Sequence, residues 1–277
     1  MSTALTAHAR AWRPTARELL PLLVAGALVL TAIAYPLSSG SARDVVSWAI
    51  VVLGSVLSVA HAGLSRGART AAGVLALVVA AAVAFESVGL ATGFPYGSYD
   101  YADVLGPTLL GVPFLVPLAW LMMAWPSWLL GGHLARTTRP TRRRFVRVAW
   151  AAAVFAAWDV VLDPQMVQAG YWTWASPSPG LPGIDTVPLT NLAGWLVAGA
   201  VLMTVLDVLV TRTAVPDAPR IGNAAPLLVL GWMTLGGALA HAGWLGLPGS
   251  AAWGAALAVP VLVVLAVQHR RAGAGTG

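Results

Sequence analysis

Several ionisable side chains lie within apolar stretches of this sequence, where charge is costly. Those expected at one common depth are Glu86, Asp159, Asp163 and His241. An ionisable residue inside a membrane span costs roughly 2.5–3.5 kcal/mol on insertion scales, so each one needs an explanation. Asp159 and Asp163 are four residues apart, which places them on one helix face about 6 Å from each other. Two carboxylates this close in a low dielectric should not both be ionised, so one is expected to hold a proton that it can donate.

Aromatic residues accompany these acids along the chain. Trp158 adjoins Asp159, and Trp172 follows in the next loop. Trp120 and Trp195 lie in two other apolar stretches. An aromatic face stabilises a nearby cation by roughly 0.5–2 kcal/mol. A proton donor, a second carboxylate and aromatic walls together predict acid-catalysed chemistry on an isoprenoid double bond. Protonation would give a tertiary carbocation, and a water oriented by the second acid or the histidine would add to it.

Structural explanations for the same residues remain open. The acids could hydrogen-bond across helices and hold a bundle together, and the aromatic residues could form the belt found at membrane interfaces. Asp207 is expected to pair locally with Arg212, because both lie near the same end of one span. His61 and His133 are expected among lipid headgroups at helix ends.

The composition indicates a membrane protein. Of the 277 residues, 58% are hydrophobic and 9% are charged, whereas about a quarter of the residues in soluble domains are charged. The mean hydropathy is +0.78. The Lys and Arg positions are all Arg, which excludes a lysine Schiff base. Cysteine is absent, which excludes thiolate catalysis, disulfides, Fe–S clusters and Cys-ligated zinc.

With roughly 20 apolar residues per span, the sequence predicts an all-α polytopic membrane bundle of eight helices. Their expected ranges are 19–37, 45–64, 71–91, 108–132, 147–167, 190–211, 224–245 and 250–268. Residues 1–271 would form a single integral membrane domain, followed by a disordered Gly-rich tail at 272–277. The first helix also resembles a signal peptide ending at Ala32-Ile33-Ala34. It is long for a signal, so we expect it to be retained.

The arginines predict the orientation of the chain. All of them except Arg43 fall on the side of the N-terminus when eight spans are drawn. This asymmetry places both termini in the cytoplasm of a multi-pass protein of the cell membrane. The Arg-rich stretch at 135–147 is explained as a topology anchor beside anionic lipid rather than as a nucleic-acid site.

Two predicted outer loops and the helices around them resemble each other. Glu86 lies seven residues before Gly93, and Asp163 lies seven residues before Gly170. After each loop, a Val-Pro pair begins eight residues before a Trp. These matches predict a parallel hairpin repeat, in which spans 3-4 correspond to spans 5-6. Each copy places an acid near the outer end of its first helix.

The same segments carry a family resemblance over about residues 80–200. The first signature consists of Glu86, TGFPYGSY at 92–99, LGP at 105–107, GVP at 111–113 and PLAW at 117–120. The second consists of WD at 158–159, DP at 163–164, GYW at 170–172, PLTN at 188–191 and GW at 194–195. Together they resemble the CruF-type carotenoid biosynthesis proteins, membrane carotenoid hydratases that include the bisanhydrobacterioruberin hydratases. Tyr96 stands where the family pattern has Phe, a difference that concerns the substrate pocket.

The resemblance implies hydration of a terminal C=C bond of an acyclic carotenoid, of the bisanhydrobacterioruberin or lycopene type. The product would be a tertiary alcohol, and no cofactor or metal is assigned. Asp159 or Asp163 would be the general acid, and Glu86 or His241 would orient water. The residues expected to line the end-group pocket are Tyr99, Tyr101, Trp120, Trp158, Tyr171, Trp172, Asn191 and Trp195. Expected partners are the carotenoid, membrane lipid and other enzymes of the carotenoid pathway.

Two other functions fit parts of the sequence. The spacing of Asp159 and Asp163 is one that prenyltransferases use to hold Mg²⁺ and a diphosphate, but the outer side offers a single Arg for such an anion. Buried acids and a histidine also suit a small proton-coupled transporter or a pigment-binding membrane protein. The parallel repeat and the one-sided placement of the acids favour the hydratase over the transporter.

Overall fold

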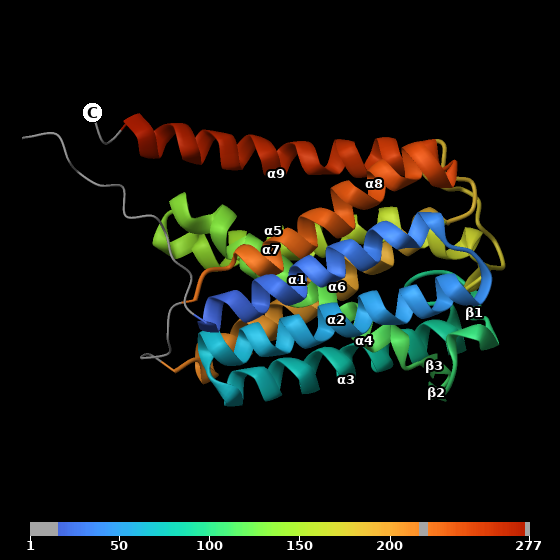
Figure 1. Ribbon diagram of the computed structural model, residues 1–277, viewed down its shortest axis with the longest axis horizontal. Helices are drawn as coiled ribbons and strands as arrows, with labels where there is room; N and C mark the ends of the chain where they lie inside the picture. The colour runs from blue at the N-terminus through green and yellow to red at the C-terminus, as the bar shows by residue number, and fades with distance from the viewer. Residues whose placement is uncertain (1–15, 216–220, 275–277) are drawn as a thin grey trace, which may run out of the picture.

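A computed structural model describes residues 16–215 and 221–274 of the chain (Figure 1). The α-helices of this part are α1 (Ala16–Ala34), α2 (Gly40–Arg66), α3 (Ala68–Thr92), α4 (Leu115–Leu134), α5 (Pro140–Gln168), α6 (Leu189–Thr213), α7 (Ala224–Gly231), α8 (Gly237–Ala240) and α9 (Pro248–Ala274). Short 3-10 turns lie at η1 (Tyr35–Leu37), η2 (Asp103–Leu105) and η3 (Ala135–Thr137).

Eight segments of this described part are long and apolar enough to cross a membrane. One of them, Ala224–Leu245, is a composite span. In it, the π-helical segment η4 (Trp232–Gly236) joins α7 to α8, and a second π-helical segment, η5 (His241–Leu245), follows α8. The chain is therefore an all-α polytopic helix bundle, as the sequence predicts.

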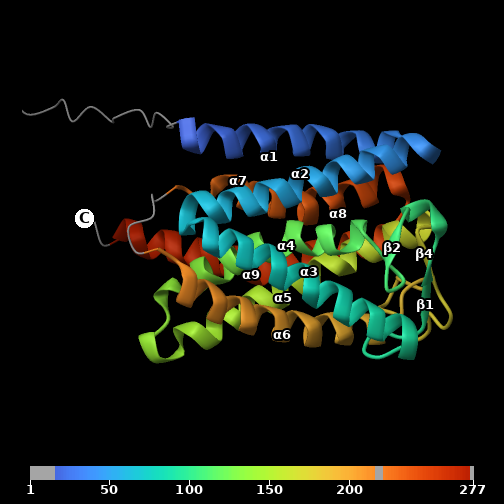
Figure 2. The ribbon, with the colours of Figure 1, turned by 90° about the horizontal axis from the view of Figure 1, so that it is seen from below.

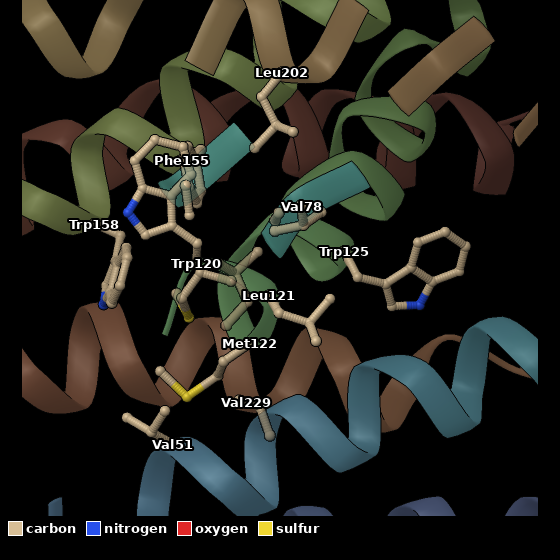
Figure 3. Packing of buried hydrophobic residues seen from close by; sticks show 14 of the residues in the cluster. Val51, Val78, Trp120, Leu121, Met122, Trp125, Phe155, Trp158, Leu202 and Val229 are labelled. Carbon is tan, nitrogen blue, oxygen red and sulfur yellow. The ribbon is translucent and has the colours of Figure 1, made fainter. Parts of the chain in front are cut away.

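Helix α4 lies at the centre of the bundle. Of its span, 72% is buried, against 22% for that of α1 and 17% for that of α9. A helix that is apolar around its whole circumference is expected to be surrounded by others, and α2, α3, α5 and α7 all pack against α4. Figure 3 shows Trp120 and Trp125 of α4 near Val51 of α2, Val78 of α3 and Phe155 of α5.

The fourth span begins later than predicted. Helix α4 starts at Leu115, not at residue 108. The residues before it form a hairpin of β2 (Thr108–Leu109) and β3 (Val112–Pro113). In the turn of this hairpin, Leu110 has a φ of 54° and Gly111 a φ of 82°. A left-handed backbone at these positions cannot continue into a right-handed helix, so the apolar run is longer than the helix.

A two-stranded ribbon lies at one end of the bundle (Figure 2). Strand β1 (Tyr99–Tyr101) pairs antiparallel with β4 (Trp172–Trp174), with Tyr99 opposite Trp174 and Tyr101 opposite Trp172. Residues two apart on a strand point to the same face. The ribbon therefore joins the two Gly-, Pro- and aromatic-rich loops and turns four aromatic side chains the same way.

Helix α1 begins and helix α9 ends at the same end of the bundle (Figure 1), as an even number of spans requires. Which end faces the cytoplasm stays a prediction, and so does the parallel repeat. Helix α9 is described as far as Ala274. The end of the predicted disordered tail, at 275–277, lies outside the described residues.

Candidate functional site

Three carboxyl side chains line one cavity beneath the β1–β4 ribbon. Glu86 comes from α3, and Asp159 and Asp163 come from α5. The cavity has a volume of about 100 Å³, and we call it the carboxyl cavity. The three residues are buried, with exposed fractions of 4%, 3% and 1% respectively. The sequence predicts that these three acids lie at one depth, and in the structure they line one cavity.

Every residue predicted for the end-group pocket also lines this cavity. These residues are Tyr99, Tyr101, Trp120, Trp158, Tyr171, Trp172, Asn191 and Trp195. They come from helices α4, α5 and α6, from strands β1 and β4, and from the turn after α5. The lining thus combines segments that are far apart in the sequence.

A single amide joins the two aspartates. The Nδ2 atom of Asn191 donates to Oδ2 of Asp159 at 2.6 Å and to Oδ2 of Asp163 at 2.7 Å. An amide nitrogen carries two hydrogens, so both are used here. The pairing orients the two carboxyl groups toward each other across Asn191, which is itself 2% exposed.

The two aspartates differ in their remaining hydrogen bonds. Oδ1 of Asp163 accepts the indole N–H of Trp172 at 2.5 Å and that of Trp174 at 3.2 Å. Among the described residues, Oδ1 of Asp159 has no donor. Donors aimed at a carboxyl group stabilise its ionised form. The hydrogen bonds therefore stabilise the ionised form of Asp163 more than that of Asp159. Asp159 keeps one carboxyl oxygen that is available to a ligand.

Two tyrosine hydroxyls donate hydrogen bonds to the carboxyl group of Glu86. Its Oε2 atom accepts the hydroxyl of Tyr99 at 2.5 Å and that of Tyr101 at 2.8 Å. Burial raises the pKa of both Tyr99 and Tyr101 well above that of an exposed phenol, and the Glu86 carboxyl raises each pKa further. Both hydroxyls therefore stay protonated and donate to Glu86. One carboxyl oxygen of Glu86 is left for another partner.

Indole rings form the wall of the cavity opposite the ribbon. The ring of Trp195 lies 5.0 Å from that of Trp120 and 5.9 Å from that of Trp158, centroid to centroid. Figure 3 shows Trp120, Trp158 and Phe155 gathered together, with the ring of Phe155 5.4 Å from that of Trp120 and 6.1 Å from that of Trp158. The Nε1 atom of Trp120 and the hydroxyl of Tyr96 are buried without a hydrogen-bond partner in the described part of the chain. Two free donors beside three acids are suited to hold a water or a hydroxyl group.

Tyr171 connects the carboxyl cavity with the start of α2. Its hydroxyl donates to Oδ1 of Asp44 at 2.7 Å and lies 3.1 Å from Oγ of Ser47. Burial raises the pKa of Tyr171 to about 12, so the hydroxyl is protonated at neutral pH. Asp44 is only partly buried, so this chain of polar groups leads from the surface toward the acids.

His241 does not join the acids, contrary to what its position in the sequence suggests. It is fully buried, and its Nδ1 lies 2.6 Å from Oγ of Ser250 while its Nε2 lies 3.0 Å from Oε1 of Gln165. Gln165 lines the carboxyl cavity, but His241 does not. The π-helical turns of its span shift the register of the side chains, which a regular helical pattern does not anticipate.

Asp207 and His61 also have partners that the sequence did not indicate. Asp207 is fully buried and pairs with Arg144 at 3.0 Å and Arg147 at 2.5 Å, both on α5, rather than with Arg212. His61 is fully buried instead of lying among headgroups, and its Nδ1 accepts the indole N–H of Trp125 at 3.1 Å. Both residues hold helices together, away from the carboxyl cavity.

Several lining residues were not assigned from the sequence. Tyr35, Ser47, Tyr96 and Trp174 all line the carboxyl cavity. A signal existed for Trp174, because it is two residues after Trp172 and strand alternation places both on one face. Tyr35 and Ser47 carry no such signal, since isolated Tyr and Ser residues are common in apolar helices. In the described part of the chain, no three His, Asp or Glu side chains are arranged to hold a metal ion.

A family described as "Carotenoid biosynthesis protein" matches residues 46–263. The chain is 37% identical over 128 residues to a bisanhydrobacterioruberin hydratase of Haloarcula japonica. This match covers 44% of the chain and 40% of the relative, so less than half of the relative's own length is spanned. No solved structure matches the chain.

Proposed function

Because the chain belongs to the carotenoid biosynthesis protein family, we propose that it is a membrane carotenoid hydratase. It would add water across a terminal C=C bond of an acyclic carotenoid, of the bisanhydrobacterioruberin or lycopene type. The observation that carries the proposal is the gathering of Glu86, Asp159 and Asp163 in one aromatic cavity. The name of the Haloarcula japonica relative supports the same activity.

The first step is protonation of the alkene. Asp159 is the proposed proton donor, because it lines the cavity and its Oδ1 has no donor among the described residues. Asp163, held by Asn191, Trp172 and Trp174, is the proposed ionised partner. Proton transfer from Asp159 to the less substituted alkene carbon leaves a tertiary carbocation. The faces of the neighbouring indoles stabilise such a cation.

The second step is capture of water. The oxygen of a water molecule forms a bond to the cationic carbon, and the water loses one proton. Glu86 is the proposed acceptor of that proton, because one of its carboxyl oxygens is free of the two tyrosine hydroxyls. The free donors of Tyr96 and Trp120 are suited to position the water. When the proton returns from Glu86 to Asp159 through solvent, the net reaction is alkene plus water to tertiary alcohol.

Pigment analysis tests the proposal. The chain is expressed in a host that makes an acyclic carotenoid, and the pigments are analysed by mass spectrometry. We expect pigments that have gained one or two waters. Unchanged pigments in cells whose membranes contain the chain would contradict the proposal. Unchanged pigment that copurifies with the chain would favour a pigment-binding protein, and an altered membrane potential would favour a proton-coupled transporter.

A matched control comes from the Arg-rich stretch. Arg142 is exposed and lies at the start of α5, far along that helix from Asp159. Arg142→Gln should leave water addition unchanged, because this residue is assigned to topology and not to the cavity. The same expression test with Arg142→Gln shows whether a general change in the membrane protein alters the pigments.

A further inference from the structure

A second cavity lies against the carboxyl cavity. It has a volume of about 290 Å³. The two cavities share part of their lining, namely Tyr35, Ile50, Trp158, Leu162, Gln165 and Met233. These six side chains therefore belong to the walls of both cavities, and the second cavity is the immediate neighbour of the one that holds the three acids.

The second cavity is apolar and uncharged. Its walls are the end of α1 with η1, one face of α5, and the composite span from η4 to η5. Among the described residues, no charged side chain lines it. Its polar groups are Gln165, the indole nitrogens and Tyr35, whose buried hydroxyl lacks a hydrogen-bond partner in the described part of the chain. Such a lining suits a long hydrocarbon and excludes an ionic ligand.

The second cavity opens toward the lipid-facing surface. Leu37, Leu239 and Trp244 line it and are 69%, 60% and 60% exposed. Helix α1 packs against α7 on one side, and η1 packs against η5 on the other, with the cavity between these contacts. Figure 2 shows α1 at the edge of the bundle, along α7 and α8. All of these segments belong to membrane spans, so the opening faces lipid.

The composite span has irregular helical turns beside this opening. The π-helical segments η4 and η5 lie on either side of the single turn of α8. Wide helical turns of this kind occur frequently at functional sites. Gly236 and Gly237 line the cavity where η4 meets α8. A Cβ on Gly236 would lie 2.9 Å from the ring of Trp232, and one on Gly237 would lie 3.0 Å from the side chain of Val161, so neither position has room for a side chain.

We propose that this second cavity is a polyene chamber. It takes the conjugated chain of a carotenoid whose end group lies in the carboxyl cavity, and it admits the chain sideways from the bilayer between α1 and α8. This inference rests on the proposed function, because the carotenoid is the ligand assumed. A carotenoid dissolves in the bilayer and is far longer than the carboxyl cavity. The ribbon of β1 and β4 covers that cavity on its outer side, so the chain needs a lateral path.

Two substitutions from opposite walls test the chamber. Ala240→Phe fills it from α8, and Ala32→Phe fills it from α1; both alanines line the chamber. Ala256→Phe is the matched control, because Ala256 is exposed on α9 and lines neither cavity. Each protein is purified from cells that contain an acyclic carotenoid. Bound pigment is measured from its visible absorption per mole of protein, a readout that does not depend on turnover.

Ala240→Phe and Ala32→Phe are each expected to lower the bound pigment by about tenfold or more, the scale on which hydrophobic pockets discriminate size. Ala256→Phe should bind as much pigment as the unaltered chain. Conversion of a short isoprenoid with the same terminal double bond should survive in both chamber variants. That activity would show that the variants fold and that only the long chain is excluded.

The outcomes separate the two proposals. Full pigment binding by both Ala240→Phe and Ala32→Phe would overturn the polyene chamber, even where hydrated products are formed. Pigment that is bound by the unaltered chain and lost from the chamber variants, without any hydrated product, would support the chamber and overturn the hydratase. Absence of bound pigment from the unaltered chain would overturn the chamber, whereas the hydratase is decided by the mass spectrometry of the pigments.

Discussion

The side-chain amide of Asn191 lies between two carboxyl groups, those of Asp159 and Asp163. How these groups share their hydrogen-bond donors decides which of the two acids can donate a proton. Each amide hydrogen is donated to a different aspartate. Asp163 receives two further indole donors, whereas Asp159 receives none among the described residues. Two carboxyl groups of one helix therefore have different surroundings. Such pairs allow one acid to donate a proton while the other stays ionised.

Asp159→Asn tests the proton donor. The substitution preserves the size of the side chain and removes its acidic proton. Loss of a general acid lowers a rate by about 10²–10⁴-fold, so hydrated pigment should fall by that order when measured by mass spectrometry. Asp163→Asn should also abolish water addition, because the charge beside Asp159 is lost. The amount of each protein in the membrane should stay the same. Full activity of Asp159→Asn would refute the proton donor, and full activity of Asp163→Asn would refute the role of the ionised partner.

Asn191→Leu tests the bridge between the aspartates. Leucine has a similar volume, but it leaves Oδ2 of both carboxyl groups without a donor. Leaving buried polar groups unpaired costs about 1–3 kcal/mol, so the melting temperature in detergent should fall. Thr204→Leu on the same helix is the control, because Thr204 is exposed. Equal melting temperatures of the two variants would show that the bridge adds no stability.

At the scale of elements, helices α4 and α5 pack closely together at Gly131. A Cβ placed on Gly131 would lie 2.5 Å from the carbonyl oxygen of Arg147 and 2.9 Å from the amide nitrogen of Ala151. Those atoms belong to the backbone of α5 and cannot rotate away. Gly131 therefore lets the two helices approach each other at this point.

Gly131→Ala should separate α4 from α5. Overpacking of this kind costs about 1–3 kcal/mol, and thermal unfolding in detergent measures the loss. The neighbouring Gly132→Ala is the control, because a Cβ there meets only the flexible Arg147 side chain, at 3.5 Å. That change should be neutral or should stabilise helix α4 by up to about 1 kcal/mol. A larger loss for Gly132→Ala than for Gly131→Ala would contradict this account of the interface.

At the scale of the whole molecule, the arginines and the even number of spans predict how the bundle is oriented in the membrane. The buried pairing of Asp207 with Arg144 and Arg147 joins α5 to α6 at the end where α5 begins. The carboxyl cavity lies toward the other end of α5. Arg144 and Arg147 thus lie at the end of α5 that is opposite to the carboxyl cavity.

Reporter fusions test the predicted orientation. An enzyme that is active only in the cytoplasm, fused after residue 277, should be active, because the positive-inside rule places both termini there. The same reporter inserted in the loop between α5 and α6, at residues 169–188, should be inactive. The reverse pattern would place the carboxyl cavity near the cytoplasmic side instead.

The sequence by itself determined the helices and the pair of acids on α5. Both depend on local patterns: length and apolar composition define a span, and a spacing of four residues puts Asp159 and Asp163 on one face. The motif residues around the two loops also named part of the lining of the cavity, but not Tyr35 or Ser47. The start of α4 was misplaced, because the hairpin before it is as apolar as the helix.

Only the tertiary structure decided which helices meet and which polar groups become partners. Lipid-facing and protein-facing sides of a span are both apolar, so hydropathy does not encode the lateral order of helices. For that reason the sequence paired Asp207 with Arg212 instead of with Arg147 of α5. The contact of Trp172 with Asp163 depends on how the loop after α5 folds back. The placement of His241 beside Gln165 depends on a π-helical register, and the chamber next to it depends on the position of α1.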